Sequence, residues 1–413
     1  MIEIFITGRF HTSSLVFFLD DKAAIPVGFE GAPVSATRRQ RSVLKAGLDN
    51  RGLNALDHDN IPQHLTPSIS IKLIPPTDLS NAWYAGQPFI ILKDAIFEHS
   101  TAFRHVAELL TRYSEDDLDR PMLFIGSDGG PDHNLTSIMV MLSYITIFFE
   151  LDLDFLYAVR TPPNFSFINP AERFMATANI ALIGVSLSRN HLGENEKFVK
   201  NLMSKKQWRE AHEKNPNNDY PRLALEGTED ARRLLKSRFE SLRYKGEKVI
   251  VSYAANEAEI NTIEANITDQ WPEINLSKIS KAEAMNVPSF KEFFDKHVKA
   301  TSYTFQVKKS NDTNCKFHKA KRMDQTINIP WLPTPQLKGE KYDEFDEVYG
   351  TEPNDDCQPR KIKAMHTQEE RLTHPSFALA STRARIIITC TECKFPRLLY
   401  SQYSMTIDSG IYR

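Results

Sequence analysis

Apolar and polar positions in residues 10–190 form two kinds of pattern: short apolar runs and longer stretches with helical spacing. The short runs predict strands at 15–19, 23–27, 68–74, 89–92, 121–125 and 155–159. Apolar residues three and four positions apart predict a helix over 101–113, and the long apolar stretch over 135–149 predicts a buried helix. Pro170 is suited to the first turn of another helix, which we expect to reach about residue 188.

The order of these elements predicts the fold class. Strands come first and helices alternate with strands later, which is typical of an α/β protein with a mixed sheet and helices on both faces. We expect the first two strands, separated only by residues 20–22, to pair with each other. Residues 10–190 would form this core.

The rest of the chain differs in character from the predicted core. Residues 191–300 are rich in charge and carry helical spacing, so they predict a mainly helical insertion or accessory domain. Residues 301–413 are rich in Pro, Asp and Lys and predict an irregular carboxyl-terminal region. Three regions agree with a length of 413 residues, at roughly 150 residues per domain.

Composition narrows the class of protein further. Lys and Arg total 51 against 53 Asp and Glu, so any contact with nucleic acid depends on local basic patches. Four cysteines cannot form a disulfide scaffold and suit a reducing compartment. The first ten residues lack the features of a signal peptide, and the apolar stretch 138–149 is shorter than the roughly 20 residues of a membrane helix. We therefore expect an intracellular protein that is not secreted and has no membrane span.

Three acidic residues occupy positions where this order of elements would bring carboxylates together. Asp20 ends the first strand, Asp128 follows the central strand, and Glu172 lies in the first turn of the last helix. Adjacent strands lie about 4.8 Å apart, so side chains at their ends can share one site. Carboxylates so placed repel one another unless cations neutralise them, and hard oxygen ligands suit Mg²⁺ or Mn²⁺. Each residue taken alone could instead be an ordinary turn, cap or helix-dipole residue.

The segments around these acids resemble a known family. Residues 127–133 (SDGGPDH) are similar to the second-aspartate motif of retroviral-type integrases and cut-and-paste transposases. Residues 167–173 (FINPAER) resemble the segment that carries the third acidic residue of these enzymes, and residues 19–22 (LDDK) resemble the end of their first-aspartate strand. The resemblance covers about residues 10–190 and implies the ribonuclease-H-like fold of DDE-type transposases.

The resemblance implies cleavage and joining of DNA strands by phosphoryl transfer through two Mg²⁺ or Mn²⁺ ions. Asp20, Asp128 and Glu172 would hold both ions, with Asp21 or Asp94 as the alternative first aspartate. Asp132 and His133 would contact these ligands without binding the ions themselves, and His133 would pack or form a hydrogen bond rather than act as a base. DNA as partner, a nuclear or otherwise intracellular location and assembly into multimers are also implied.

The chain departs from the family pattern in three respects. The step from Asp128 to Glu172 is 172 − 128 = 44 positions and longer than in integrases, only 19 residues precede Asp20, and the sequence ends soon after Cys393. We therefore expect a transposon-derived copy that is truncated or reduced to its core. The alternatives are a catalytically inactive, domesticated or decayed derivative that binds DNA or protein, and a different nuclease with the same fold.

Two further groups of residues are candidates for binding. DNA phosphates would be contacted by five arginines, Arg38, Arg39, Arg41, Arg160 and Arg173. Cys390 and Cys393 have half of a zinc-ribbon spacing, which Cys315 and His318 could complete as a Zn²⁺ site. An orphaned half-site at the carboxyl end is the alternative interpretation.

Overall fold

The computed structural model describes residues 10–21, 24–27, 64–76, 83–161, 169–183, 205–324 and 328–338, together with single residues and short strand pairs between and beyond these ranges. Residues 1–358 form one compact unit and residues 359–413 a second. In the second unit the described residues are an antiparallel pair of strands, β16 (Ala384–Thr389) and β17 (Pro396–Tyr400).

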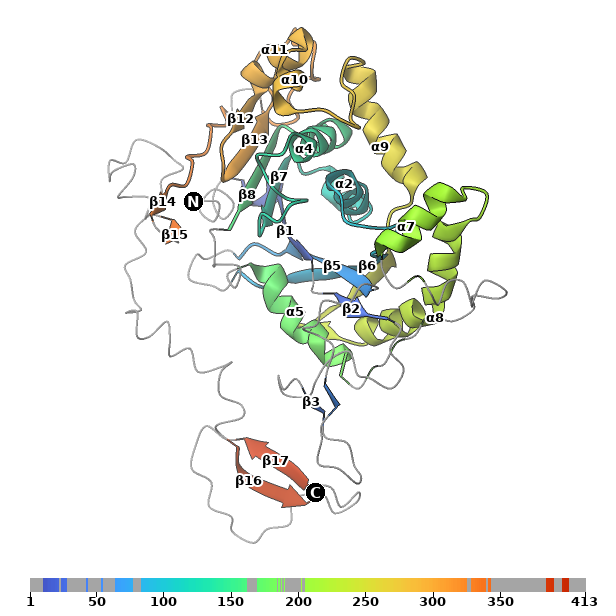
Figure 1. Cartoon of the computed structure of the whole chain (residues 1–413). Helices are drawn as coiled ribbons and strands as arrows, with labels where there is room; N and C mark the ends of the chain where they lie inside the picture. The colour runs from blue at the N-terminus through green and yellow to red at the C-terminus, as the bar shows by residue number, and fades with distance from the viewer. Residues whose placement is uncertain are drawn as a thin grey trace. The chain divides into compact units, whose positions relative to one another are not determined.

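The first unit is built around one nine-stranded mixed sheet (Figure 1). Its strands are, in spatial order, β11 (Ile250–Tyr253), β6 (Gly86–Asp94), β5 (His64–Leu73), β1 (Ser14–Asp21), β7 (Met122–Ser127), β8 (Phe155–Arg160), β13 (Thr304–Lys308) and β12 (Val298–Ala300), with β2 (Ile25–Pro26) beside β5. Strand β1 is parallel to β7, and β7 is parallel to β8. Strand β5 runs antiparallel to both of its neighbours β1 and β6. The predicted mixed α/β sheet is therefore confirmed.

The predicted pairing of the first two strands is wrong. Strand β2 pairs with β5, as Ile25 lies opposite Leu65, whereas β1 lies between β5 and β7. A short apolar run buries its side chains equally well beside any central strand, so the pattern alone does not choose its partner. The last predicted helix is also shorter than expected, since α5 (Pro170–Ala181) ends well before residue 188.

Helices cover both faces of the sheet (Figure 1). One face packs against α2 (Ala102–Leu110), α4 (Ile138–Glu150), α9 (Glu257–Gln270), α10 (Lys281–Met285) and α11 (Pro288–His297). The other packs against α5 and α8 (Tyr220–Glu240). The helices predicted over 101–113 and 135–149 are confirmed as α2 and α4. Burial on both faces explains why the central strands are apolar almost throughout.

The remaining described elements are short or lie around the sheet. They are η1 (His11–Ser13), α3 (Glu115–Leu118), α7 (Lys205–Lys214), and the strand pairs β3 (Ser42–Val43) with β4 (Leu53–Asn54), β9 (Arg243–Tyr244) with β10 (Glu247–Lys248), and β14 (Leu337–Lys338) with β15 (Lys341–Tyr342). No helix in the described part of the chain is long and apolar enough to cross a membrane.

Strand β1 separates two different environments. Leu15, Phe17 and Leu19 belong to the core beneath α2 and α4. Because successive side chains of a strand point to opposite faces, Phe18 and Asp20 face the other way. Gly126 on β7 lies opposite Phe18, and a β-carbon there would come within 2.4 Å of the Phe18 ring. A side chain at residue 126 would therefore push β1 and β7 apart just below their carboxyl ends.

Candidate functional site

Asp20 and Asp128 lie at the same edge of the sheet because of the register of β1 and β7. The last pair in this parallel register is Phe18 with Gly126. Two residues further along each strand come Asp20 and Asp128. Asp20 is buried and Asp128 is exposed, so one of these carboxylates lies in the interior and the other is accessible to solvent.

Glu172 reaches this edge through the start of α5. Asn169 is fully buried at the N-cap, where its side-chain oxygen accepts a hydrogen bond from the Ala171 backbone N–H at 3.0 Å. Its Nδ2 donates to the carbonyl oxygen of Leu19 at 3.1 Å. One side chain therefore starts the helix and fixes it to the residue before Asp20, which places Glu172 in the first turn beside the end of β1.

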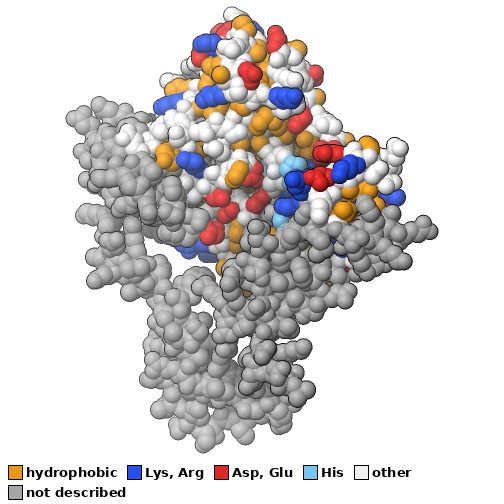
Figure 2. All heavy atoms as spheres, in the orientation of Figure 1, with side chains coloured by type: hydrophobic (Ala, Val, Ile, Leu, Met, Phe, Trp, Pro, Cys, Tyr) orange, Lys and Arg blue, Asp and Glu red, His pale blue; other side chains and the backbone are white. Residues whose placement is uncertain are grey.

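The three carboxylates act on one another electrostatically. Burial, together with the negative charges of Asp128 and Glu172 and a smaller effect from Asp21, raises the pKa of Asp20 to about 8. Glu172 Oε2 is buried and has no hydrogen-bond partner among the described residues. Figure 2 shows acidic side chains gathered on this face over the region where β1 ends and α5 begins. A cation here would neutralise the repulsion and satisfy the unpaired oxygen.

The carboxylate oxygens of the three acids are further from one another than the ligand atoms of a compact site for one ion. Two groups of His, Cys, Asp or Glu in the described residues have ligand atoms that all lie within 4.8 Å of one another. These are His105 with Asp132 and His133, and His297 with Cys315 and His318. Asp20, Asp128 and Glu172 do not form such a group, so their carboxylate oxygens do not all lie within 4.8 Å of one another. Carboxylate oxygens are the donors that Mg²⁺ and Mn²⁺ prefer.

Asp21 points to the opposite face from Asp20. Its Oδ2 accepts a hydrogen bond from Ser100 Oγ at 2.5 Å. Burial alone would raise the pKa of Asp21, but the positive charges of Lys93 and His105 and hydrogen bonds from Ser100 and Ser68 hold it below its usual range. A cavity of about 440 Å³ beside Asp21 is lined by Asp132 as well, and not by Asp20, Asp128 or Glu172. Asp21 therefore belongs to a buried polar network on the α2 side.

Asp132 joins this network and also lies near Asp128. A β-carbon on Gly130 would be 3.4 Å from one carboxylate oxygen of each aspartate. Asp132 Oδ2 is 2.6 Å from His105 Nε2, and the His105 ring packs on His133 with centroids 4.4 Å apart. Burial would raise the pKa of Asp132, yet the hydrogen bond from His105 keeps it below its ordinary range.

His133 is buried and packs rather than contacting the acidic trio. Burial and, to a smaller extent, the neighbouring His105 lower the pKa of His133 to about 3. The His133 ring packs on that of His105. Sequence reasoning missed His105, because it lies within the α2 helix and no motif surrounds it.

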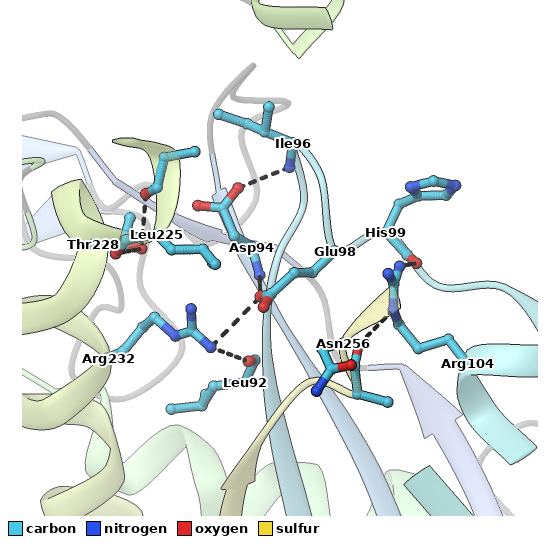
Figure 3. A network of polar contacts seen from close by, with 12 residues as sticks. Leu92, Asp94, Ile96, Glu98, His99, Arg104, Leu225, Thr228, Arg232 and Asn256 are labelled. Atoms are coloured by element: carbon cyan, nitrogen blue, oxygen red, sulfur yellow. Dashed lines mark hydrogen bonds and ion pairs between the residues drawn. The ribbon is translucent and has the colours of Figure 1, made fainter. Parts of the chain in front are cut away.

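Asp94, the alternative first aspartate, is bound into a different network. It is fully buried at the end of β6, where Oδ1 accepts from the Ile96 N–H at 2.8 Å and Oδ2 pairs with Arg189 at 2.6 Å. Its backbone N–H donates to Glu98, which also pairs with Arg232 at 3.5 Å (Figure 3). These contacts stabilise the turn after β6.

Two of the predicted DNA-contacting arginines lie next to the site. Arg160 ends β8, with its guanidinium 4.5 Å from the Tyr303 ring centroid, and its side chain packs on Gly129, whose φ of +79° favours glycine. Arg173 is exposed, follows Glu172 and stacks over the Tyr84 ring at 3.8 Å. Arg38, Arg39 and Arg41 lie outside the described residues.

The predicted zinc ligands are described in part. Cys315 and His318 lie close together in the loop after β13, and Cys390 and Cys393 lie outside the described residues. Sequence reasoning missed His297, the third member of this group. Its distance of 18 positions from Cys315 gives no motif, and only the pairing of β12 with β13 brings the end of α11 next to Lys308.

Comparison of the chain with protein-family models, with curated proteins and with solved structures gives no match.

Proposed function

We propose that the chain is a ribonuclease-H-like nuclease of the transposase type, which cleaves and joins DNA strands with two divalent cations held by Asp20, Asp128 and Glu172. The observation that carries the proposal is that these acids, 108 and 44 positions apart, come to one sheet edge through the β1–β7 register and the Asn169–Leu19 hydrogen bond. The sheet order β6-β5-β1-β7-β8, with β5 antiparallel, fits the ribonuclease-H-like part.

The donor set at the edge fits Mg²⁺ or Mn²⁺. All three groups are carboxylates, Asp20 is buried, and Glu172 Oε2 has no described hydrogen-bond partner. Two such ions supply activation of an attacking oxygen and stabilisation of the leaving oxygen in phosphoryl transfer. Asp128, which is exposed, leaves the solvent side of the site open to a phosphate backbone.

The protein's own residues would bind and orient the DNA. Arg173 follows Glu172 directly and is exposed, and Arg160 borders the loop that carries Asp128. Arginine binds phosphate oxygens through two parallel N–H groups. Both arginines can therefore position a DNA strand over the acidic edge, which is the sheet edge that carries Asp20, Asp128 and Glu172. A DNA substrate also underlies the predicted nuclear or otherwise intracellular location.

The experiment is a nicking assay on labelled duplex DNA with Mg²⁺ or Mn²⁺, using the full chain. We expect nicking by the wild type, and activity near background for Asp128→Asn. Asp116→Asn is the matched control, because Asp116 is exposed on α3 and the change removes the same charge. Circular dichroism checks that each variant is folded.

Two results would contradict the proposal. Equal nicking by the wild type and a folded Asp128→Asn variant would exclude the assigned site. No nicking by the wild type, combined with tight duplex binding, would instead support a non-catalytic DNA-binding derivative.

A further inference from the structure

A second group of metal-ligating side chains lies on the other side of β8, away from the carboxylates. His297 is the last residue of α11, and Cys315 and His318 follow in the loop after β13. One ligand atom from each lies within 4.8 Å of the other two. Cys315 Sγ is 3.3 Å from His297 Nε2, and Cys315 is a free thiol.

Both imidazoles are oriented as metal ligands usually are. His297 Nδ1 lies 3.0 Å from the Lys308 carbonyl oxygen, and His318 Nδ1 lies 2.6 Å from the Lys319 carbonyl oxygen. A carbonyl oxygen only accepts, so each Nδ1 carries the proton and donates it. In the neutral ring, Nε2 then keeps its lone pair. The Nε2 atom of His297 lies 3.3 Å from Cys315 Sγ, and that of His318 accepts a hydrogen bond from Ser310. A backbone carbonyl that holds Nδ1–H is the usual support of a histidine bound to metal through Nε2.

The surroundings of the group are apolar on one side and open on the other. His297 is completely buried, stacks on Phe293 with centroids 5.2 Å apart and meets Phe317 edge-on. Cys315 and His318 are half-buried. Ser310 lies beside His318: its backbone N–H donates a hydrogen bond to His318 Nε2 at 3.0 Å, and its Oγ lies 3.0 Å from the same atom. An ion bound to His318 Nε2 would replace the hydrogen bond from the Ser310 N–H.

We propose that His297, Cys315 and His318 bind one Zn²⁺ ion, which fixes the end of α11 to the loop after β13. A thiolate with two imidazole nitrogens is a donor set that Zn²⁺ prefers, whereas Mg²⁺ and Mn²⁺ prefer oxygen. The proposal requires neither Cys390 nor Cys393. It is independent of the nuclease proposal, since none of its ligands belongs to the acidic edge.

The test is the metal content of the full chain, purified with an affinity tag that contains no histidine and measured by inductively coupled plasma mass spectrometry. We expect zinc in equimolar amount with the wild-type chain and loss of most of it from Cys315→Ser and from His318→Gln. His11→Gln is a matched histidine control because His11 is half-buried and remote in the fold, where its ring contacts the Pro75 carbonyl oxygen. A Cys390→Ser/Cys393→Ser double variant should keep its zinc.

Cobalt spectroscopy tests the same site in the wild-type chain and does not depend on whether a variant folds. Wild-type chain stripped by a chelator and titrated with Co²⁺ should develop a thiolate-to-cobalt charge-transfer band and the intense visible bands of tetrahedral Co²⁺. Zn²⁺ should displace the Co²⁺ and protect Cys315 from alkylation. Absence of the charge-transfer band would overturn the proposal. Full zinc content in folded Cys315→Ser, or its loss only in the Cys390/Cys393 double variant, would overturn it equally.

Discussion

Asn169 Nδ2 donates a hydrogen bond to the Leu19 carbonyl oxygen at 3.1 Å, across 150 positions of sequence. The same side chain caps α5 through the Ala171 N–H. Helix α5 carries Glu172, and Leu19 precedes Asp20. This one buried amide therefore sets where the third carboxylate stands relative to the first.

We predict that Asn169→Ala and Asn169→Ser separate the two roles of this residue. Alanine removes both the cap and the bond to Leu19 and should lower the free energy of unfolding by about 1–2 kcal/mol. Serine is also a good N-cap, so it should restore part of that stability but not the bond to Leu19. Both variants should lose nicking activity by about 10- to 100-fold, as is typical when a group that orients a metal ligand is removed.

Urea unfolding and the nicking assay check this pair. The decisive observation is Asn169→Ser, in which activity should fall further than stability does. Wild-type activity in a folded Asn169→Ser variant would show that Asn169 only caps the helix.

Asp20 and Asp21 should differ in what their loss changes. Asp20→Asn removes a carboxylate from the acidic edge, so Mn²⁺ should no longer raise the melting temperature of the protein, as it should for the wild type. Asp21→Asn leaves that edge intact but weakens the buried contacts with Ser100, Lys93 and His105. It should cost about 1–3 kcal/mol of stability and keep the response to Mn²⁺.

Differential scanning fluorimetry with and without Mn²⁺ measures both effects. A response to Mn²⁺ that survives in Asp20→Asn and disappears in Asp21→Asn would reverse the assignment of the first aspartate. Asp116→Asn again provides a control for the loss of one negative charge at an exposed position.

The choice between Asp20 and Asp21 illustrates what the sequence could predict. The apolar run 15–19 predicted the strand, and it is confirmed as β1. Both faces of β1 are buried, so alternation of apolar and polar residues gave no indication of which aspartate faces which helix layer. The faces are distinguished only by partners that arrive later in the chain, such as Ser100 for Asp21 and α5 for Asp20.

Long-range pairing limited the rest of the prediction in the same way. Strand β2 was assigned to β1 because the two runs are neighbours in sequence, yet it pairs with β5. The sequence did not predict His297 as a metal ligand, because its partners Cys315 and His318 lie beyond the hairpin of β12 and β13. Local pattern therefore predicted which segments are strands and helices, but contacts between distant segments decide which side chains share a site.

Arg173 should contribute to DNA binding as a phosphate contact. Arg173 is exposed and directly follows Glu172 in the sequence. Arg173→Ala should therefore weaken duplex binding by a similar factor for every sequence and lower the slope of log affinity against log salt by about 1. Arg233→Ala is the matched control, because Arg233 is exposed on α8 and pairs within its own helix with Glu229 and Asp230. Fluorescence anisotropy over a range of salt concentrations measures both slopes, and equal slopes for the two variants would contradict the assignment.

Asp117 should make the fold sensitive to acid independently of the candidate site. Its side chain is 3% exposed, pairs with Lys72 and closes the capping box of α3 with Ser114. Burial would raise the pKa of Asp117, but hydrogen bonds from Lys72 and Ser114 hold it below the ordinary value of 3.8. Because the folded pKa is lower than the unfolded one, this stabilisation is present above the unfolded pKa. It is lost as the pH falls through the folded pKa.

Asp117→Asn should therefore lower the free energy of unfolding by about 1–3 kcal/mol at neutral pH, where the charged hydrogen bonds are intact. The difference from the wild type should shrink as the pH is lowered below about 4, because the wild type then loses the same interaction. Urea unfolding across this pH range measures the difference, and Asp116→Asn should stay within about 0.5 kcal/mol of the wild type throughout. A difference for Asp117→Asn that stays constant down to the lowest pH would mean that the Asp117 carboxylate charge does not stabilise the fold, and that the variant acts through packing alone.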